Sequence, residues 1–304
     1  MTGHSDNIKG GTVMLIAVGS LSAMDACLKV LSATYPPLQV VALRALASLP
    51  VIVVWIGVTG GFGQLLRIRL PLHLLRGALG IFMLAAFVYG VRNLPLSTAY
   101  AIFFIEPLLI TMFAALILKE RIEWQRWAAI AVGLLGVLVV LRPTGGHVVT
   151  RAGLAVVLTA VAYALSAITV RILGRTDSTQ SMVFWLILMV AVGGSILALP
   201  QWRPIQQQHA WVIAGMALSG FVGQWALTEA FKIAESSFIA PFEYTALAWG
   251  VAFDWFFWRA IPAGRTFLGA AVIIACGIYL IRRERTAHAD IPHPGAIGAD
   301  AAVE

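Results

Sequence analysis

Residues 96–118 read LSTAYAIFFIEPLLITMFAALIL, an apolar run with a single carboxylate, Glu106, near its middle. The hydrocarbon core of a bilayer is about 30 Å thick, and a helix needs roughly 20 apolar residues to cross it. This run is therefore long enough for one crossing. Because Pro107 follows Glu106 and removes a backbone hydrogen bond, we expect the helix to loosen at this point.

The same criterion of length finds nine further runs along the chain. Hydrophobic residues make up 60% of the sequence and charged residues only 12%, against roughly 25% charged residues in soluble domains. The composition therefore predicts an all-α integral membrane protein with ten transmembrane helices and a surface in contact with the lipid bilayer. The predicted spans are Gly11–Leu31, Leu38–Gly57, Pro71–Val91, Leu96–Leu118, Trp124–Leu141, Gly153–Leu173, Ser181–Leu199, Ala210–Phe231, Ser236–Phe257 and Gly264–Ile281.

Basic residues are concentrated in the short loops between these runs. The formal net charge is +7, which in a soluble chain would suggest nucleic acid as a partner. With the amino terminus inside, twelve of the 21 Lys and Arg residues fall on the inner side and six on the outer side. Cytoplasmic loops are enriched in Lys and Arg. We therefore predict a protein of the bacterial inner membrane with both termini cytoplasmic, and no nucleic-acid partner.

The two halves of the chain resemble each other. An offset of 142 residues places Lys29 on Arg171, and an offset of 137 places Glu106 on Glu243. Halves with five helices each, an odd number, must enter the membrane in opposite orientations, which is the inverted-repeat plan of alternating-access carriers. Duplication that serves folding alone and chance matching of apolar residues are the alternatives to this interpretation.

Several ionisable residues fall inside the predicted spans, where a charge costs about 2.5–3.5 kcal/mol on insertion scales. Asp25 and Lys29 are spaced i, i+4 on the first span, so they could neutralise each other and only stabilise helix packing, or serve a substrate or coupling ion. Arg44 could complete this charge network or attract an anionic group. Glu229 is a weaker candidate because it could lie near the cytoplasmic end of its span.

Glu106 and Glu243 are the main candidates for a transport site. Each stands beside a proline, Pro107 in the first half and Pro241 in the second. Interrupted segments at corresponding positions of two halves indicate a binding site in transporters, and a carboxylate beside freed carbonyls suits a cation or a proton. Alternatively, both glutamates could cap the broken helices.

Signatures of enzymes and metal sites are absent from the sequence. The six histidines lie at segment edges or in the tails, and the two cysteines, Cys27 and Cys276, are far apart, so no ligand cluster for a metal is formed by spacing. Phosphate-binding glycine loops and nucleophile elbows do not occur. We therefore expect no enzyme activity, no cofactor and no metal.

Blocks in both halves carry a family resemblance. The first half contains Leu94-Pro95-Leu96, Glu106-Pro107 and Leu118-Lys119-Glu120-Arg121, and the second contains Ala240–Leu247 followed by Gly269–Gly277. At this spacing the chain resembles the EamA-type drug/metabolite transporter superfamily over residues 10–284. Members similar to this sequence carry amino acids, riboflavin, S-adenosylmethionine or unknown metabolites, in either direction.

The resemblance implies two inverted five-helix repeats, over residues 8–146 and 147–284, with residues 285–304 as a disordered cytoplasmic tail. The expected function is secondary transport of a small organic metabolite by alternating access. A non-coupled channel, and a membrane enzyme or scaffold without transport activity, are the alternatives. A homodimer is a candidate assembly. By analogy with the family, the residues near substrate would be Glu106, Tyr100, Trp225, Glu243 and Tyr244.

Overall fold

The computed structural model describes residues 2–59, 63, 65, 68–119, 123–141, 150–233 and 240–289, and all regular elements in these ranges are helical. The α-helices are α1 (Thr2–Thr34), α2 (Pro37–Thr59), α3 (Leu70–Asn93), α4 (Leu96–Phe103), α5 (Glu106–Ile117), α6 (Trp124–Leu141), α7 (Arg151–Leu173), α8 (Thr179–Ala198), α9 (Ala210–Ile233), α11 (Ala246–Trp258) and α12 (Gly264–Ala289). Short 3-10 helices are η2 (Leu199–Gln201), η3 (Gln207–His209) and η4 (Ala240–Thr245).

Each predicted span falls on a helix or on a pair of consecutive helices. Eight helical stretches in the described ranges are long and apolar enough to cross a membrane, and α4 with α5 counts as one of them. The two other predicted spans correspond to η4 with α11 and to α12, whose apolar part, Gly264–Leu280, is shorter. The chain is therefore an all-helical, multi-pass membrane protein.

The helix expected to loosen at Glu106 is broken there. Helix α4 ends at Phe103 and α5 begins at Glu106, with Pro107 in its first turn, where the missing N–H of proline does no harm. In the second half, η4 leads into α11 in the corresponding way. Positive φ angles follow both broken elements, at Lys119 (58°) and Arg259 (52°).

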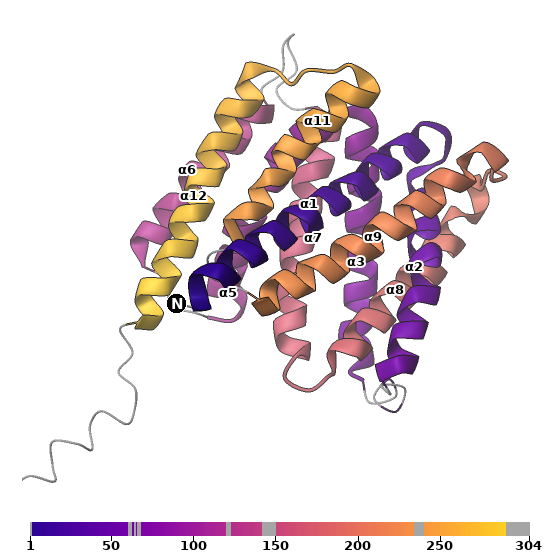
Figure 1. The fold of residues 1–304 in the computed structure, drawn as a ribbon, viewed down its shortest axis with the longest axis horizontal. Helices are drawn as coiled ribbons and strands as arrows, with labels where there is room; N and C mark the ends of the chain where they lie inside the picture. Colours follow the sequence, from indigo (N-terminus) through magenta and orange to yellow (C-terminus); the bar gives the residue numbers. More distant parts are fainter. Residues whose placement is uncertain are drawn as a thin grey trace, which may run out of the picture.

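The helices pack as a bundle in which elements from both halves alternate (Figure 1). The most extensive helix pairs are α1 with α9, α2 with α8, α3 with α7, and α6 with α12. The start of α1 and the end of α12 lie at the same end of the bundle, at the bottom of Figure 1. We call this the terminal end, and the opposite end the distal end.

One expectation about the carboxyl terminus is wrong. Helix α12 continues to Ala289, so residues 285–289, which we assigned to a disordered tail, are helical. The apolar run of the last predicted span stops near Ile281. A helix can extend beyond the apolar part of a span because its backbone hydrogen bonds are internal. The rest of the predicted tail, residues 290–304, lies outside the described residues.

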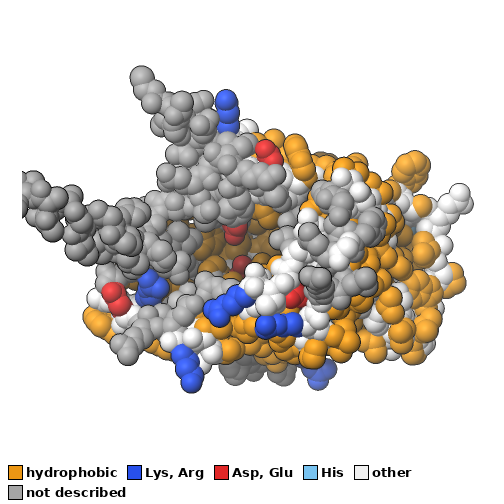
Figure 2. Space-filling model, turned by 90° about the horizontal axis from the view of Figure 1, so that it is seen from below, with side chains coloured by type: hydrophobic (Ala, Val, Ile, Leu, Met, Phe, Trp, Pro, Cys, Tyr) orange, Lys and Arg blue, Asp and Glu red, His pale blue; other side chains and the backbone are white. Residues whose placement is uncertain are grey.

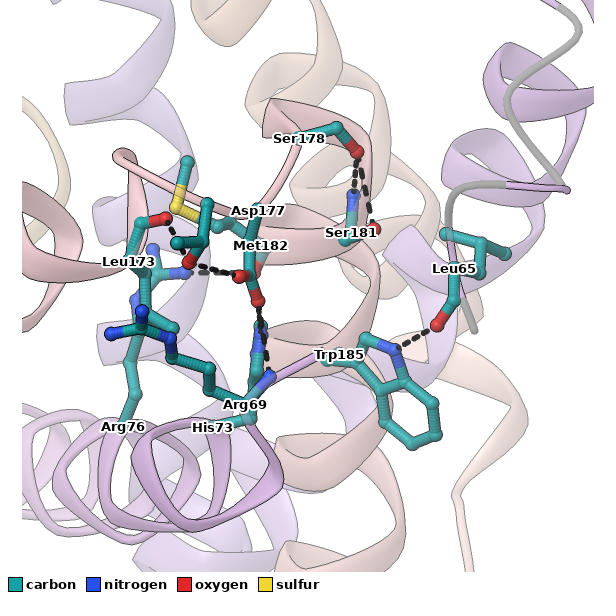
Figure 3. A network of polar contacts seen from close by, with 11 residues as sticks. Leu65, Arg69, His73, Arg76, Leu173, Asp177, Ser178, Ser181, Met182 and Trp185 are labelled. Atoms are coloured by element: carbon teal, nitrogen blue, oxygen red, sulfur yellow. Dashed lines mark hydrogen bonds and ion pairs between the residues drawn. The ribbon is translucent and has the colours of Figure 1, made fainter. Parts of the chain in front are cut away.

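A buried polar contact joins the two halves at the terminal end (Figure 3). His73 Nε2 in α3 lies 2.8 Å from Asp177 Oδ2 in the α7–α8 connection, and both side chains are almost fully buried. Thr176 donates to the same carboxylate at 2.6 Å and the Arg69 backbone N–H at 3.4 Å. Burial acts to raise the pKa of Asp177, but these hydrogen bonds outweigh it and hold the pKa below its ordinary value. The carboxylate is therefore ionised at neutral pH.

We expect His73→Ala to lower the free energy of unfolding by about 1–3 kcal/mol, because the buried Asp177 carboxylate loses a hydrogen-bond partner. Denaturation of the purified protein in detergent measures this change. Leu74→Ala is the matched control, since the neighbouring Leu74 side chain is 54% exposed. Equal effects of both variants would contradict a stabilising role of the contact.

Candidate functional site

A cavity of about 260 Å³ lies where α1, α7 and α9 meet the two broken elements. Figure 2 looks at the terminal end of the molecule and shows a hollow with apolar walls and acidic side chains inside it. The cavity therefore lies inside the protein and is reached from the terminal end (Figure 2). The residues that line it are Val18, Leu21, Ser22, Asp25, Tyr100, Phe103, Phe104, Glu106, Pro107, Tyr163, Leu227, Glu243, Tyr244 and Ala246.

Two carboxylates from the broken elements share this cavity. Glu106 is the first residue of α5, and Glu243 lies in η4, so each helix break places an acid at the wall. Both side chains line the same cavity, so negative charges on the two would repel each other. Among the described residues, no hydrogen bond or ion pair satisfies either carboxylate. A cation or a proton between them would relieve the repulsion.

The third carboxylate, Asp25, already has partners. It accepts a hydrogen bond of 3.0 Å from the Tyr100 hydroxyl. The half-buried Arg44 of α2 is near enough to act on it electrostatically, without an ion pair between the two among the described contacts. Asp25 therefore has a hydrogen-bond partner at the cavity wall, whereas Glu106 and Glu243 have none among the described residues.

Aromatic rings form much of the remaining wall. The ring centroids of Phe104 and Tyr244 are 5.1 Å apart, and those of Phe103 and Tyr163 are 5.6 Å apart, in edge-to-face geometry. The Tyr244 hydroxyl is buried without a partner in the described part of the chain. Such walls can contact a planar solute while the hydroxyls supply hydrogen bonds.

A glycine keeps Tyr100 in its place. A Cβ atom on Gly250 of α11 would lie 2.8 Å from Tyr100 Cδ2, closer than van der Waals contact allows. The absence of a side chain at Gly250 lets α4 approach α11, and this approach sets the Tyr100 hydroxyl beside Asp25.

The local pairing of Asp25 with Lys29 that the i, i+4 spacing suggested is wrong. Lys29 Nζ instead lies 3.1 Å from Asp254 Oδ1 in α11 and donates a 2.9 Å hydrogen bond to the Leu94 carbonyl. It also lies 4.5 Å from the centroid of the Trp258 ring. Lys29 is therefore committed to the distal side of the cavity and is not a ligand within it.

The cavity does not include every predicted residue. Trp225 of α9 is 60% exposed, and neither Trp225 nor Glu229 is part of the lining. Two residues that the structure places at the site were not predicted: Tyr163, which lines the cavity, and Asp254, which pairs with Lys29. Asp254 could have been found by the cost of a carboxylate inside an apolar run, whereas nothing in the sequence marks Tyr163 as a residue that faces the other half.

A multi-pass helical protein with broken helices around an acid-lined cavity has the architecture of a membrane transport protein. The EamA-like transporter family model matches residues 8–142 and 150–283, and the chain belongs to this family. It is thus a transporter of metabolites and not an enzyme.

Relatives and a solved structure agree with this assignment. The riboflavin transporter of Vibrio cholerae is 29% identical over 70% of this chain and 72% of its own length. The S-adenosylmethionine uptake transporter of Rickettsia conorii is 28% identical over 90% of this chain and 92% of its own length. A solved crystal structure with 19% identity matches 90% of this chain and 98% of its own with a TM-score of 0.61, a likeness of fold alone.

Proposed function

We propose that the protein is an alternating-access carrier for a cationic or zwitterionic organic metabolite that contains a planar ring. The observation that carries this proposal is the pair of carboxylates, Glu106 and Glu243, which face one cavity without a partner among the described residues. The cargo's cationic group would lie between them, and Tyr100 and Tyr244 would contact its ring. A positive charge nearby stabilises carboxylates that have no other partner, so binding of a cation is favoured over binding of an anion.

The packing of the helices supports a carrier built from two inverted repeats, over residues 8–146 and 147–284. Suppose that α7 corresponds to α1 and α9 to α3. Exchange of the two halves then turns the α1–α9 pair into the α7–α3 pair, and both pairs pack closely. The pairs α2 with α8 and α6 with α12 then map onto themselves. The family model also matches the chain twice, near these bounds.

Two histidine contacts at opposite ends of the bundle support the same repeat. His209, at the start of α9, has its Nδ1 2.9 Å from the hydroxyl of Tyr35, which lies between α1 and α2. An offset of 142 places Tyr35 on Asp177, and an offset of 136 places His73 on His209. The distal contact is thus the counterpart of the His73–Asp177 contact at the terminal end.

We further propose the bacterial inner membrane as the location, with the terminal end in the cytoplasm. The excess of Lys and Arg in the loops of that end supports this orientation. The cavity in this structure would then open to the cytoplasm.

A ligand panel tests the class of cargo. We expect S-adenosylmethionine, which carries sulfonium and ammonium groups and an adenine ring, to raise the melting temperature of the detergent-solubilised protein, and uncharged adenosine to have little effect. Saturating ligand at 100 times its Kd stabilises a protein by about 2.7 kcal/mol. Stabilisation by riboflavin and not by any cation would overturn the proposed charge selectivity.

Counterflow separates a carrier from a channel. Proteoliposomes loaded with the stabilising ligand should accelerate uptake of the labelled ligand from outside, because a carrier exchanges one bound molecule for another. A channel would instead give uptake that neither saturates nor responds to internal ligand. Uptake of that kind would overturn the alternating-access mechanism.

A further inference from the structure

An ion pair lies directly on the distal side of the cavity, where α1, α4 and α11 meet. Asp254 of α11 is fully buried and accepts hydrogen bonds from the backbone N–H groups of Leu96 and Ser97, at 2.8 and 2.9 Å, and from the Ser97 hydroxyl at 2.6 Å. These N–H groups begin α4, so Asp254 caps α4 from another helix. Lys29 of α1 completes the arrangement at 3.1 Å.

The helices that form this pair also form the wall of the cavity. Asp25 precedes Lys29 by one turn of α1, and Tyr100 follows Leu96 by one turn of α4. The Tyr100 hydroxyl and Asp25 are themselves hydrogen-bonded at 3.0 Å. A solute in the cavity therefore meets the Tyr100–Asp25 contact first and the Lys29–Asp254 pair behind it. A path to the distal end requires α1 to separate from α4 and α11.

The contacts show on which side the separation would occur. Asp254 keeps three hydrogen bonds to α4 when Lys29 leaves, so α4 and α11 can stay together. The contacts of Lys29 with Asp254 and the Trp258 ring reach from α1 to α11, and its contact with the Leu94 carbonyl reaches the turn before α4. The Lys29 side chain is 10% exposed, and hydration of its ammonium on leaving would offset part of the lost pairing.

The sequence supplies no matching pair at the terminal end. Lys29 corresponds to Arg171 at the offset of 142, but the offset of 137 that relates Glu106 to Glu243 places Asp254 on Ile117. The acid therefore has no counterpart in the first half. In this structure the Lys29–Asp254 pair is formed while the hollow opens at the terminal end (Figure 2), so the pairing goes with closure of the distal end.

We propose that Lys29 and Asp254 are the distal gate of this carrier, and that their pairing biases the protein toward the conformation that opens at the terminal end. The proposal rests on the alternating-access function inferred above. Lys29 acts as a positioning residue on α1, since it is not among the residues that line the cavity. Release of Lys29 from Asp254 is the step that admits cargo from, or delivers it to, the distal side.

Sided labelling of one cysteine tests the gate without knowledge of the cargo. Ser22→Cys places a thiol of nearly the same size at the cavity wall, in a background of Cys27→Ala and Cys276→Ala. Sealed vesicles are sorted by the accessibility of a tag on the carboxyl terminus, and a membrane-impermeant maleimide is applied to one side at a time. We expect Lys29→Met to raise the labelling rate from the distal side about tenfold and to lower it from the terminal side.

Matched variants separate gating from charge and from folding. Lys29→Arg can keep the ion pair, so its labelling rates should equal those of the parent. Lys119→Met removes an exposed charge at the terminal end and should leave the labelling rates unchanged. Monodispersity in detergent shows that each variant is folded. Lys29→Gln is a second variant that, like Lys29→Met, removes the positive charge. Distal labelling that is slow and equal in the parent and in both neutral variants would overturn the gate alone. If no variant is ever labelled from the distal side, the alternating-access function fails with it.

Discussion

Glu106→Gln and Glu243→Gln are each expected to weaken binding of the cationic cargo by about ten- to a hundredfold. The amide keeps the size of the side chain and removes its charge. Hydrogen bonds to charged groups contribute about 1.5–3 kcal/mol, and each 1.4 kcal/mol is a factor of ten in affinity. Because both carboxylates face the same cavity, the double variant should lose measurable binding and counterflow.

Calorimetric titration of the purified variants with S-adenosylmethionine, or with whichever cation stabilises the parent, measures this effect. Glu123→Gln serves as the control, because this carboxylate precedes α6 and lies outside the cavity. Unchanged affinity in both single variants would remove the carboxylate pair from the site. Loss of affinity for an uncharged ligand to the same degree would instead indicate that the variants disturb the shape of the cavity.

The spans could be predicted from the sequence because the bilayer sets a length that apolar runs must match. Trp124–Leu141 was predicted with the bounds that α6 has in the structure. The break at Glu106 was also predictable, since Pro107 lacks the N–H that a continuous helix needs. The extension of α12 to Ala289 was not, because the bilayer length says nothing about helix outside the membrane.

The orientation of side chains was harder to predict, and the errors have one cause. Helices that are apolar on all faces give no amphipathic signal, so the sequence does not tell which face meets lipid and which meets another helix. Trp225 was placed near substrate by analogy, yet its side chain is 60% exposed. Tyr163 lines the cavity although nothing in its own span distinguishes it.

The partner of Lys29 was missed for a related reason. A spacing of i, i+4 is visible in the sequence, whereas the contact with Asp254 joins residues 225 positions apart. Spacing along a helix shows which ion pairs are feasible. Lys29 pairs with the carboxylate that other hydrogen bonds already hold in place. Asp254 offers a carboxylate already oriented by α4, and Asp25 is taken by Tyr100.

This arrangement makes the two members of the gate unequal in stability. We expect Asp254→Leu to lower the free energy of unfolding by about 3–5 kcal/mol, because it removes the ionic partner of Lys29 and the acceptor of the N–H groups of Leu96 and Ser97. Lys29→Met should cost about 1–2 kcal/mol, since Asp254 keeps its hydrogen bonds to α4.

A double-mutant cycle in detergent measures the coupling between the two side chains. In the Asp254→Leu background, Lys29→Met should be neutral or stabilising, because it removes a charge that has lost its ionic partner. The capping of α4 is lost both in Asp254→Leu and in the double variant. The non-additivity of the two substitutions therefore measures the ion pair alone. Equal costs of the two single variants, with additive effects in the double variant, would show that Asp254 caps α4 independently of Lys29 and that α1 is free to separate without breaking an ion pair.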